Sequence, residues 1–273
     1  EPDGRVALDG VVEVGFTAPV AEGDWYLSVH GLPGQAALSD DGLRAVFTPT
    51  SPWLPERTYQ LEAGACETTQ AHPFVTLPNA VSPAQLEGRT WRFDTSTAEW
   101  VTPGISDLFA GLIGIDDLLV TTRERSDGLH LEVRPAMRMG STTLPIPCVA
   151  LTDIGVLDFT ASPRLSTPAK DVQVDLFGQD VRLGQVSVEA IAGSDGGRLE
   201  SIQIDATLDM RDVEALTGLT GLCTITQRLG EPCTTCPDGA DACLSAYVLA
   251  TEALEVFDVD PTSPGWDLFG LCP

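Results

Sequence analysis

Residues 171–208, DVQVDLFGQDVRLGQVSVEAIAGSDGGRLESIQIDATL, carry the strongest strand pattern in this chain of 273 residues. Apolar side chains alternate with polar ones in three runs, which are separated by the turn sequences FGQD and SDGG. This two-residue period is typical of half-buried strands and not of helices. The apolar positions change parity near Gly184, which is how a β-bulge shows in a sequence. We therefore predict a curved antiparallel meander of three strands, with an apolar inner face from Val172 to Leu208.

Further strands and two helices are predicted around this meander. An apolar stripe at i, i+3, i+4, i+7 and i+8 predicts a helix over residues 105–113. It is short and flanked by acidic residues, so we expect it to pack against a sheet and not on a membrane or partner. Asp209 is the expected N-cap of a second helix over 210–217, which Gly218 ends. Strands are predicted over residues 89–93, 118–125, 129–134 and 249–256.

Four of the seven cysteines lie in residues 222–244, LCTITQRLGEPCTTCPDGADACL. Three chemistries fit such a segment: structural disulfides, a zinc site built on Cys233 and Cys236, or a thioredoxin-like redox pair. A second C-x-x-C half-site is missing and the C-x-x-C pair lies between prolines, so disulfides are favoured. Sequence does not fix their connectivity, and an odd number leaves one cysteine over. The disulfide candidates are Cys66, Cys148, Cys223, Cys233, Cys236, Cys243 and Cys272.

The first 78 residues show short strands with turn signals at intervals of about 8 to 12 residues, the pattern of a small β-sandwich. The motifs along this part are VGFTAPV at 14–20, DG at 41–42, FTP at 47–49, Leu54, TY at 58–59 and FVT at 74–76. In this order they resemble the bacterial Ig-like domains that are repeated in S-layer and other envelope proteins. The resemblance implies a seven-stranded sandwich that acts as a spacer or display module, and it carries over no catalytic residue. Cys66 is not part of that pattern.

A mainly β, two-domain organisation follows from these patterns. Residues 1–78 are predicted to form an Ig-like β-sandwich, and residues 79–85 a short, stiff, proline-containing linker. Residues 86–273 are predicted to form a larger antiparallel β-rich domain with one or two short helices and disulfides.

The composition excludes several partners. Fifteen lysine and arginine residues against forty aspartate and glutamate residues give a net charge of −25, and such a surface repels nucleic acids and anionic membranes. No apolar run reaches the roughly 20 residues that span a bilayer. Disulfides persist in oxidising compartments, and the polar start of the sequence suits a processed exoprotein. We therefore expect a secreted or cell-envelope protein, with a lipid-anchored surface or outer-membrane protein as one form of it.

No catalytic residues are predicted, because the chain contains no nucleophile elbow, phosphate-binding loop or paired histidine motif. His30, His72 and His130 lie far apart, and His130 is expected with Glu132 and Arg134 on an ordinary polar outer face of its strand. No cofactor is expected. A calcium ion held by a loop is a minor alternative, and its ligands would be Asp258, Asp260 and Asp267.

Two classes of function remain. The first is a non-catalytic envelope protein, in which an Ig-like spacer presents a β-rich domain that is structural or binds a protein, a glycan or an apolar ligand at the cell surface. A more specific form of this hypothesis is a carrier that holds lipid between the curved sheet and a helix, and ordinary core packing of the same face is the favoured alternative. The second class is an exported hydrolase with a site assembled from scattered acids or from serine and histidine.

Overall fold

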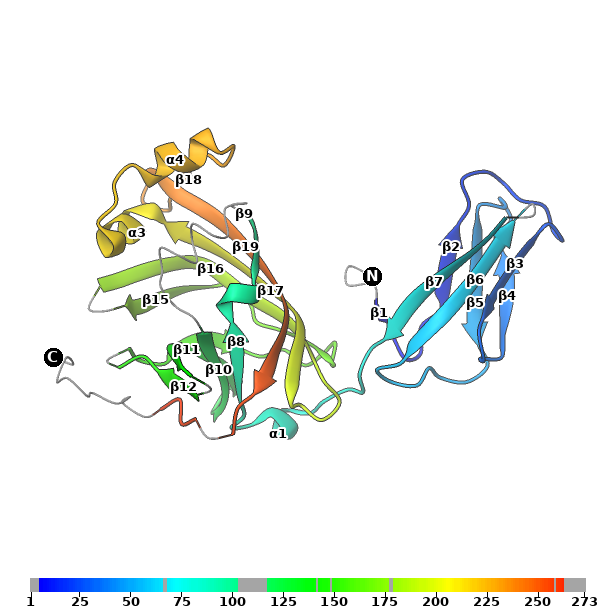
Figure 1. Cartoon of the computed structure of the whole chain (residues 1–273), viewed down its shortest axis with the longest axis horizontal. Coiled ribbons are helices and arrows are strands. Elements are labelled where there is room, and N and C mark those ends of the chain that lie inside the picture. The colour runs from blue at the N-terminus through cyan, green and yellow to red at the C-terminus, as the bar shows by residue number, and fades with distance from the viewer. Residues whose placement is uncertain are drawn as a thin grey trace. The chain divides into compact units, whose positions relative to one another are not determined.

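The computed structural model describes residues 5–65, 68–102, 117–140, 142–147, 149–176, 179–257 and 259–262. The predicted helix over 105–113 lies outside these ranges. The chain divides into two compact units, Glu1–Ala80 and Val81–Pro273, and each is described by itself (Figure 1). The division, between Ala80 and Val81, falls within residues 79–85, for which a linker was predicted.

The first unit is a β-sandwich with seven strands in its described residues. One sheet has the order β1-β7-β6-β3 and the other the order β2-β5-β4. Trp53 lies in the shared core, where its ring packs edge-on against Tyr59 and Phe74 and its Nε1 donates to the Gly10 carbonyl. This arrangement confirms the predicted sandwich, while its relation to the bacterial Ig-like domains stays a prediction. The strands are β1 (Arg5–Val6), β2 (Val12–Gly15), β3 (Trp25–Val29), β4 (Gly34–Leu38), β5 (Arg44–Pro49), β6 (Thr58–Ala65) and β7 (Thr68–Thr76).

The second unit is built from one large antiparallel sheet that curls strongly (Figure 1). Its helical elements are α1 (Pro83–Leu86), η1 (Thr95–Thr97), α3 (Met210–Thr217) and α4 (Leu222–Arg228). Its strands are β8 (Thr90–Asp94), β9 (Glu99–Thr102), β10 (Asp117–Arg125), β11 (Gly128–Met139), β12 (Thr142–Pro145), β13 (Thr152–Val156), β14 (Arg164–Ser166), β15 (Lys170–Leu176), β16 (Gln179–Ala192), β17 (Arg198–Asp209), β18 (Thr234–Thr235) and β19 (Asp241–Glu255).

Backbone pairing leads around this sheet and returns to its starting strand. The order β11-β10-β8-β19-β17-β16 forms the main path, with β13 paired to β11 and β14 paired to β16. A single bridge between Asp158 and Ser166 joins the β13 side to β14. At the same seam, the Lys170 Nζ donates to an Asp153 carboxylate oxygen at 2.9 Å, which links β15 to β13. The sheet therefore encloses an interior, as closed antiparallel barrels do.

The predicted meander is confirmed as β15, β16 and β17, which pair in antiparallel order. Its register shifts between Gly184 and Ser187, and Gln185 between them has a φ of 51°, so the predicted bulge is present. The Asp171 carboxylate accepts hydrogen bonds from the Gln185 backbone and side-chain amides, and these stabilise the bulge. This irregularity bends the long strand β16, as bulges do, and helps the sheet to curl.

The predicted helix over 210–217 is confirmed as α3. The Asp209 side chain accepts from the Arg211 backbone N–H at its start, and Gly218 ends it with a φ of 70°. Two strand predictions were too short, because β11 continues to Met139 and β19 begins at Asp241. No helix within the described residues combines the length and apolarity needed to cross a bilayer.

Candidate ligand-binding site

The interior of the curled sheet contains an apolar cavity of about 230 Å³. The wall of the cavity is formed by strands from opposite sides of the sheet, together with η1, β9 and α3. Among the lining side chains, only Thr95 carries a hydroxyl group, and none carries a charge. The lining residues are Phe93, Thr95, Ala98, Trp100, Leu118, Val133, Pro135, Val174, Val181, Leu183, Val186, Ile204, Ala206, Leu208, Val213, Leu216, Ala246 and Val248.

Small residues on two neighbouring strands contribute to this empty volume. Ala206 on β17 and Ala246 on β19 are directly paired in register, and both line the cavity. Interiors of small barrels are normally filled by their own side chains, so a pair of methyl groups at adjacent wall positions leaves room. The cavity therefore follows from the sequence of β17 and β19.

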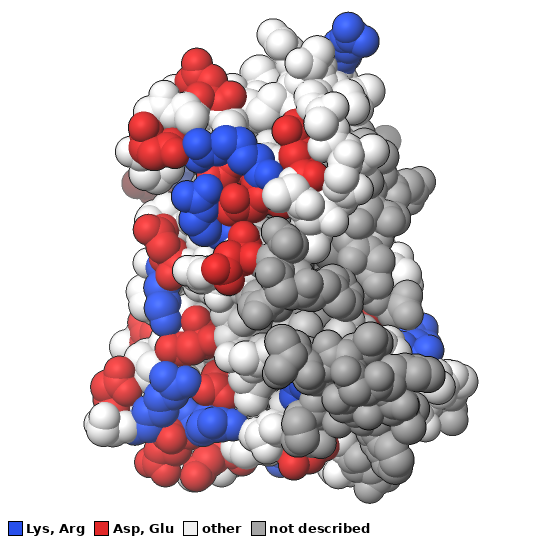
Figure 2. Space-filling view, turned by 90° about the vertical axis from the view of Figure 1, so that its left-hand side faces the viewer, with Lys and Arg blue, Asp and Glu red and all other residues white. Residues whose placement is uncertain are grey.

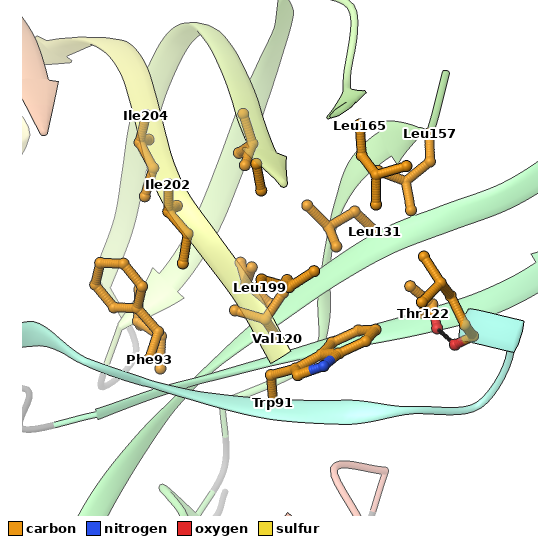
Figure 3. A pocket seen from close by; sticks show the side chains of 15 residues that line it. Trp91, Phe93, Val120, Thr122, Leu131, Leu157, Leu165, Leu199, Ile202 and Ile204 are labelled. Carbon is orange, nitrogen blue, oxygen red and sulfur yellow. Dashed lines mark hydrogen bonds between the residues drawn. The ribbon is translucent and has the colours of Figure 1, made fainter. Parts of the chain in front are cut away.

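A second, smaller space of about 50 Å³ lies against the same interior wall (Figure 3). It shares Phe93, Leu118, Val133 and Ile204 with the larger cavity. In Figure 3 the rings of Trp91 and Phe93 face the aliphatic side chains of Leu131, Leu199 and Ile202. The two spaces thus belong to one continuous apolar interior.

The polar atoms at this end of the interior have partners in the protein. The Trp91 Nε1 donates to the Gly196 carbonyl at 3.0 Å, and the Thr122 hydroxyl donates to the Leu86 carbonyl. Their apolar atoms are then free to line the space. With its polar groups satisfied, such a space is apolar enough to stay dry and suits a hydrocarbon ligand.

Helix α3 covers one side of the larger cavity with Val213 and Leu216. An ion-pair network fixes it to the sheet: Arg182 on β16 contacts the Asp212 carboxylate at 2.9 Å and the Asp209 carboxylate at 2.9 Å. Arg211 contacts Asp209 as well, and the hydrogen bond from Arg211 is the main reason why the pKa of Asp209 is lowered. Figure 2 shows basic side chains lying next to acidic ones on one face of the molecule.

The cysteine segment forms two disulfides among its described residues, Cys223–Cys233 and Cys236–Cys243. The sulfur atoms of Cys236 and Cys243 lie within 4.8 Å of an Asp209 oxygen, a spacing that could hold a metal ion. These two sulfurs are bonded to each other, so they offer no thiolate to zinc. The C-x-x-C pair is divided between the two bridges, which also removes a Cys233–Cys236 redox pair. The segment is less irregular than expected, since it contains α4 and β18 and Cys243 belongs to β19.

Several predicted site residues fall outside the described ranges. These are Cys66, Cys148, Cys272, Asp258 and Asp267, so their part in disulfides or calcium binding stays a prediction. Asp260 is described, and its carboxylate accepts from the Thr262 backbone N–H at 2.9 Å and from the Thr262 hydroxyl at 2.6 Å. It caps a local turn.

The expectation of an ordinary outer face for His130, Glu132 and Arg134 is wrong. All three side chains point away from the apolar interior, yet all three are buried. Arg134 is covered by segments distant in sequence, since it donates to the Ile146 and Pro261 carbonyls at 3.0 and 2.9 Å. Glu132 pairs with Arg125 and Arg123. Sequence periodicity gave the correct side of the strand but could not show these covering contacts.

His130 lies between two carboxylates and is not placed as a catalytic base. Its Nδ1 is 2.9 Å from an Asp153 oxygen and its Nε2 is 2.9 Å from an Asp127 oxygen, so neither ring nitrogen faces a serine. The other described histidine contact is between His72 and Gln70 at 3.1 Å. A serine–histidine pair of the kind a hydrolase needs does not occur among the described contacts of His130.

The His130 cluster predicts a pH dependence of stability. Burial alone lowers the pKa of His130, but the hydrogen bonds and charges of Asp153 and Asp127 outweigh burial and raise it. Arg125 and Lys170 also contact Asp153. A raised pKa in the folded state gives stability that is complete below the unfolded value, near 6.5, and is lost as the pH rises through the folded pKa.

We expect the second unit to lose stability between pH 6 and pH 9, and His130→Gln to remove most of that slope. Urea unfolding at each pH measures the free energy of unfolding of the wild-type protein and of the variant. The readout is the change in the free energy of unfolding between pH 6 and pH 9. The free energy at a single pH is not sufficient, because the substitution also changes stability by breaking buried hydrogen bonds. Equal slopes for the two proteins would contradict the assignment to His130.

Comparison with known proteins adds little to this geometry. No family model and no curated protein matches the chain. A solved structure of an LD transpeptidase, LdtMt1, in complex with imipenem matches at 18% identity with a TM-score of 0.20. That match covers 48% of this chain and 71% of the other. A similarity at this TM-score supports no conclusion about fold or function.

Proposed function

We propose that this is a non-catalytic extracytoplasmic binding protein whose second unit holds the acyl chain of a lipid inside its curled sheet. The observation that carries the proposal is the uncharged cavity lined by Ala206, Ala246 and their neighbours. Apolar cavities with few polar groups are the usual form of sites for hydrophobic ligands.

The volume of the cavity favours a small ligand group. Its volume of about 230 Å³ is below the roughly 300–1,000 Å³ typical of pockets for drug-sized molecules. The smaller space beside Trp91 extends the same apolar interior. An interior of this volume suits part of a single unbranched hydrocarbon chain better than a bulky ring system.

The rest of the chain supports a place outside the cytoplasm. Two disulfides stabilise the second unit, and disulfides are typical of oxidising compartments. The resemblance of the first unit to bacterial Ig-like domains supports a spacer that presents the second unit at the cell envelope, including in a lipid-anchored protein.

The test is binding of a fluorescent long-chain fatty acid by the full chain and by Ala246→Phe. The added ring occupies the cavity, so we expect the affinity to fall at least about tenfold while the melting temperature stays within a few degrees. Ser245→Phe is the matched control, because Ser245 is the residue before Ala246 on β19 and lies exposed on the outer face.

A second variant protects the test against misfolding. Ala206→Leu fills the same space from β17 with a smaller side chain, and it should weaken binding too. If the wild-type protein does not bind the probe, or if both cavity variants bind it as tightly as Ser245→Phe does, the proposal is wrong.

A further inference from the structure

The segment 218–230, here called the tip, exposes large apolar side chains next to the cavity cover. It includes α4 and follows directly on α3. Leu219 and Ile225 are each 41% exposed and Leu229 is 54% exposed. Burying such side chains away from water is energetically favourable, so a group of them exposed on one short segment indicates a contact surface.

Helix α4 has two faces with different surroundings. Leu222 and Thr226, one turn apart, are buried, and Leu222 packs with Met210 and Val213 of α3. Ile225 and Leu229, also one turn apart, therefore lie together on the exposed side. The Cys223–Cys233 disulfide ties α4 to the segment that follows it, which limits any collapse of these side chains into the protein.

The charge of the tip differs from that of the whole protein. The chain carries a net charge of −25, but within residues 218–230 the only charged side chain is Arg228. Arg228 is exposed and makes no ion pair within the part of the chain that the structure describes. In Figure 2, basic atoms lie at the uppermost point, on the side where Figure 1 places α4, with uncharged atoms directly beside them and acidic patches further away.

The tip is also connected to the cavity through helix α3. The Leu222 backbone N–H donates to the Glu214 carboxylate of α3 at 2.7 Å. From the same helix, Val213 and Leu216 project into the cavity. A surface that docks on the tip would therefore meet the protein beside the cover of its apolar site.

We propose that the tip docks on a phospholipid surface, with Leu219, Ile225 and Leu229 among the acyl chains and Arg228 at a lipid phosphate. The inference rests on the proposed lipid-binding function and adds the place where the ligand is taken up. Apolar side chains beside one unpaired cation match the layered chemistry of a zwitterionic bilayer. The acidic remainder of the protein favours zwitterionic over anionic lipid.

The experiment is flotation of the full chain with phosphatidylcholine vesicles, using the double variant Ile225→Asp/Leu229→Asp. We expect its partition onto vesicles to fall at least about tenfold relative to wild type. Leu54→Asp is the matched control, because Leu54 is 54% exposed like Leu229 but belongs to the first unit. Binding of the monomeric fatty-acid probe without vesicles is measured on the same proteins and should be unchanged.

The two readouts separate the two proposals. If the probe binds but wild-type protein does not float, or if the double variant floats equally well, the tip proposal is overturned and the cavity proposal stands. If the probe does not bind, the lipid-binding function fails, and with it the role of the tip in uptake. Sedimentation tests the other occupant: a wild-type dimer that the double variant dissociates would assign the tip to self-association and overturn membrane docking.

Discussion

Replacing Trp91 with alanine is expected to lower the free energy of unfolding of the second unit by about 3–5 kcal/mol, the usual cost of truncating a buried aromatic side chain. Trp91 on β8 is fully buried, and its Nε1 donates to the Gly196 carbonyl in the turn between β16 and β17. The substitution therefore removes a large apolar contact and leaves that carbonyl without its partner. Urea unfolding of the full chain, followed by far-UV circular dichroism, measures the loss.

The same substitution also changes the site. Trp91 lines the smaller space of the apolar interior, so its removal enlarges that space. In the folded variant we expect fatty-acid probes with longer chains to gain affinity relative to shorter ones. Phe257→Ala is the control, since Phe257 is 83% exposed and its truncation should change stability by less than about 0.5 kcal/mol. Equal losses for the two variants would contradict the placement of Trp91 in the core.

Local patterns in the sequence predicted the parts of the fold that depend on neighbouring residues. The β15–β17 meander and its bulge near Gly184 followed from a two-residue period and its one interruption. Helix α3 followed from Asp209 and Gly218, because caps satisfy backbone groups within one turn. The apolar inner face of the meander was also predicted, and Ile204, Ala206 and Leu208 on that face line the cavity.

Contacts between distant segments could not be predicted in this way. The bridge from Asp158 to Ser166, which completes the curl, leaves no periodic signal in either residue. The burial of His130 and Arg134 depends on Asp153, Ile146 and Pro261, whose positions are set by the folded sheet. The presence of a cavity could not be predicted either, because it depends on how side chains from opposite walls of the curled sheet fill the interior. The pairing of the cysteines in residues 222–244 could not be predicted either, because several pairings satisfy the same spacing.

Replacing both Cys236 and Cys243 with serine is the second large effect that we expect, a loss of about 2–4 kcal/mol in the second unit. The bridge closes a short loop, with a sequence separation of 7, and both sulfur-bearing residues are buried. Loss of the cross-link increases the entropy of the unfolded chain, and two buried hydroxyl groups replace an apolar bond. Thermal and urea unfolding under non-reducing conditions measure the change.

This bridge also positions the cover of the cavity. Cys243 is paired in register with Asp209, the residue that caps α3 and binds Arg182 and Arg211. Without the bridge, the segment between α3 and β19 opens more readily, so Val213 and Leu216 are held less firmly over the apolar interior. We therefore expect the double serine variant to bind the fatty-acid probe more weakly as well as to unfold more easily.

Removal of the Cys223–Cys233 bridge, which is only partly buried, tests the specificity of this effect: it should loosen the tip while leaving Asp209 and α3 in place. Equal probe affinity in both double variants would show that the Cys236–Cys243 bridge has no special role at the cavity.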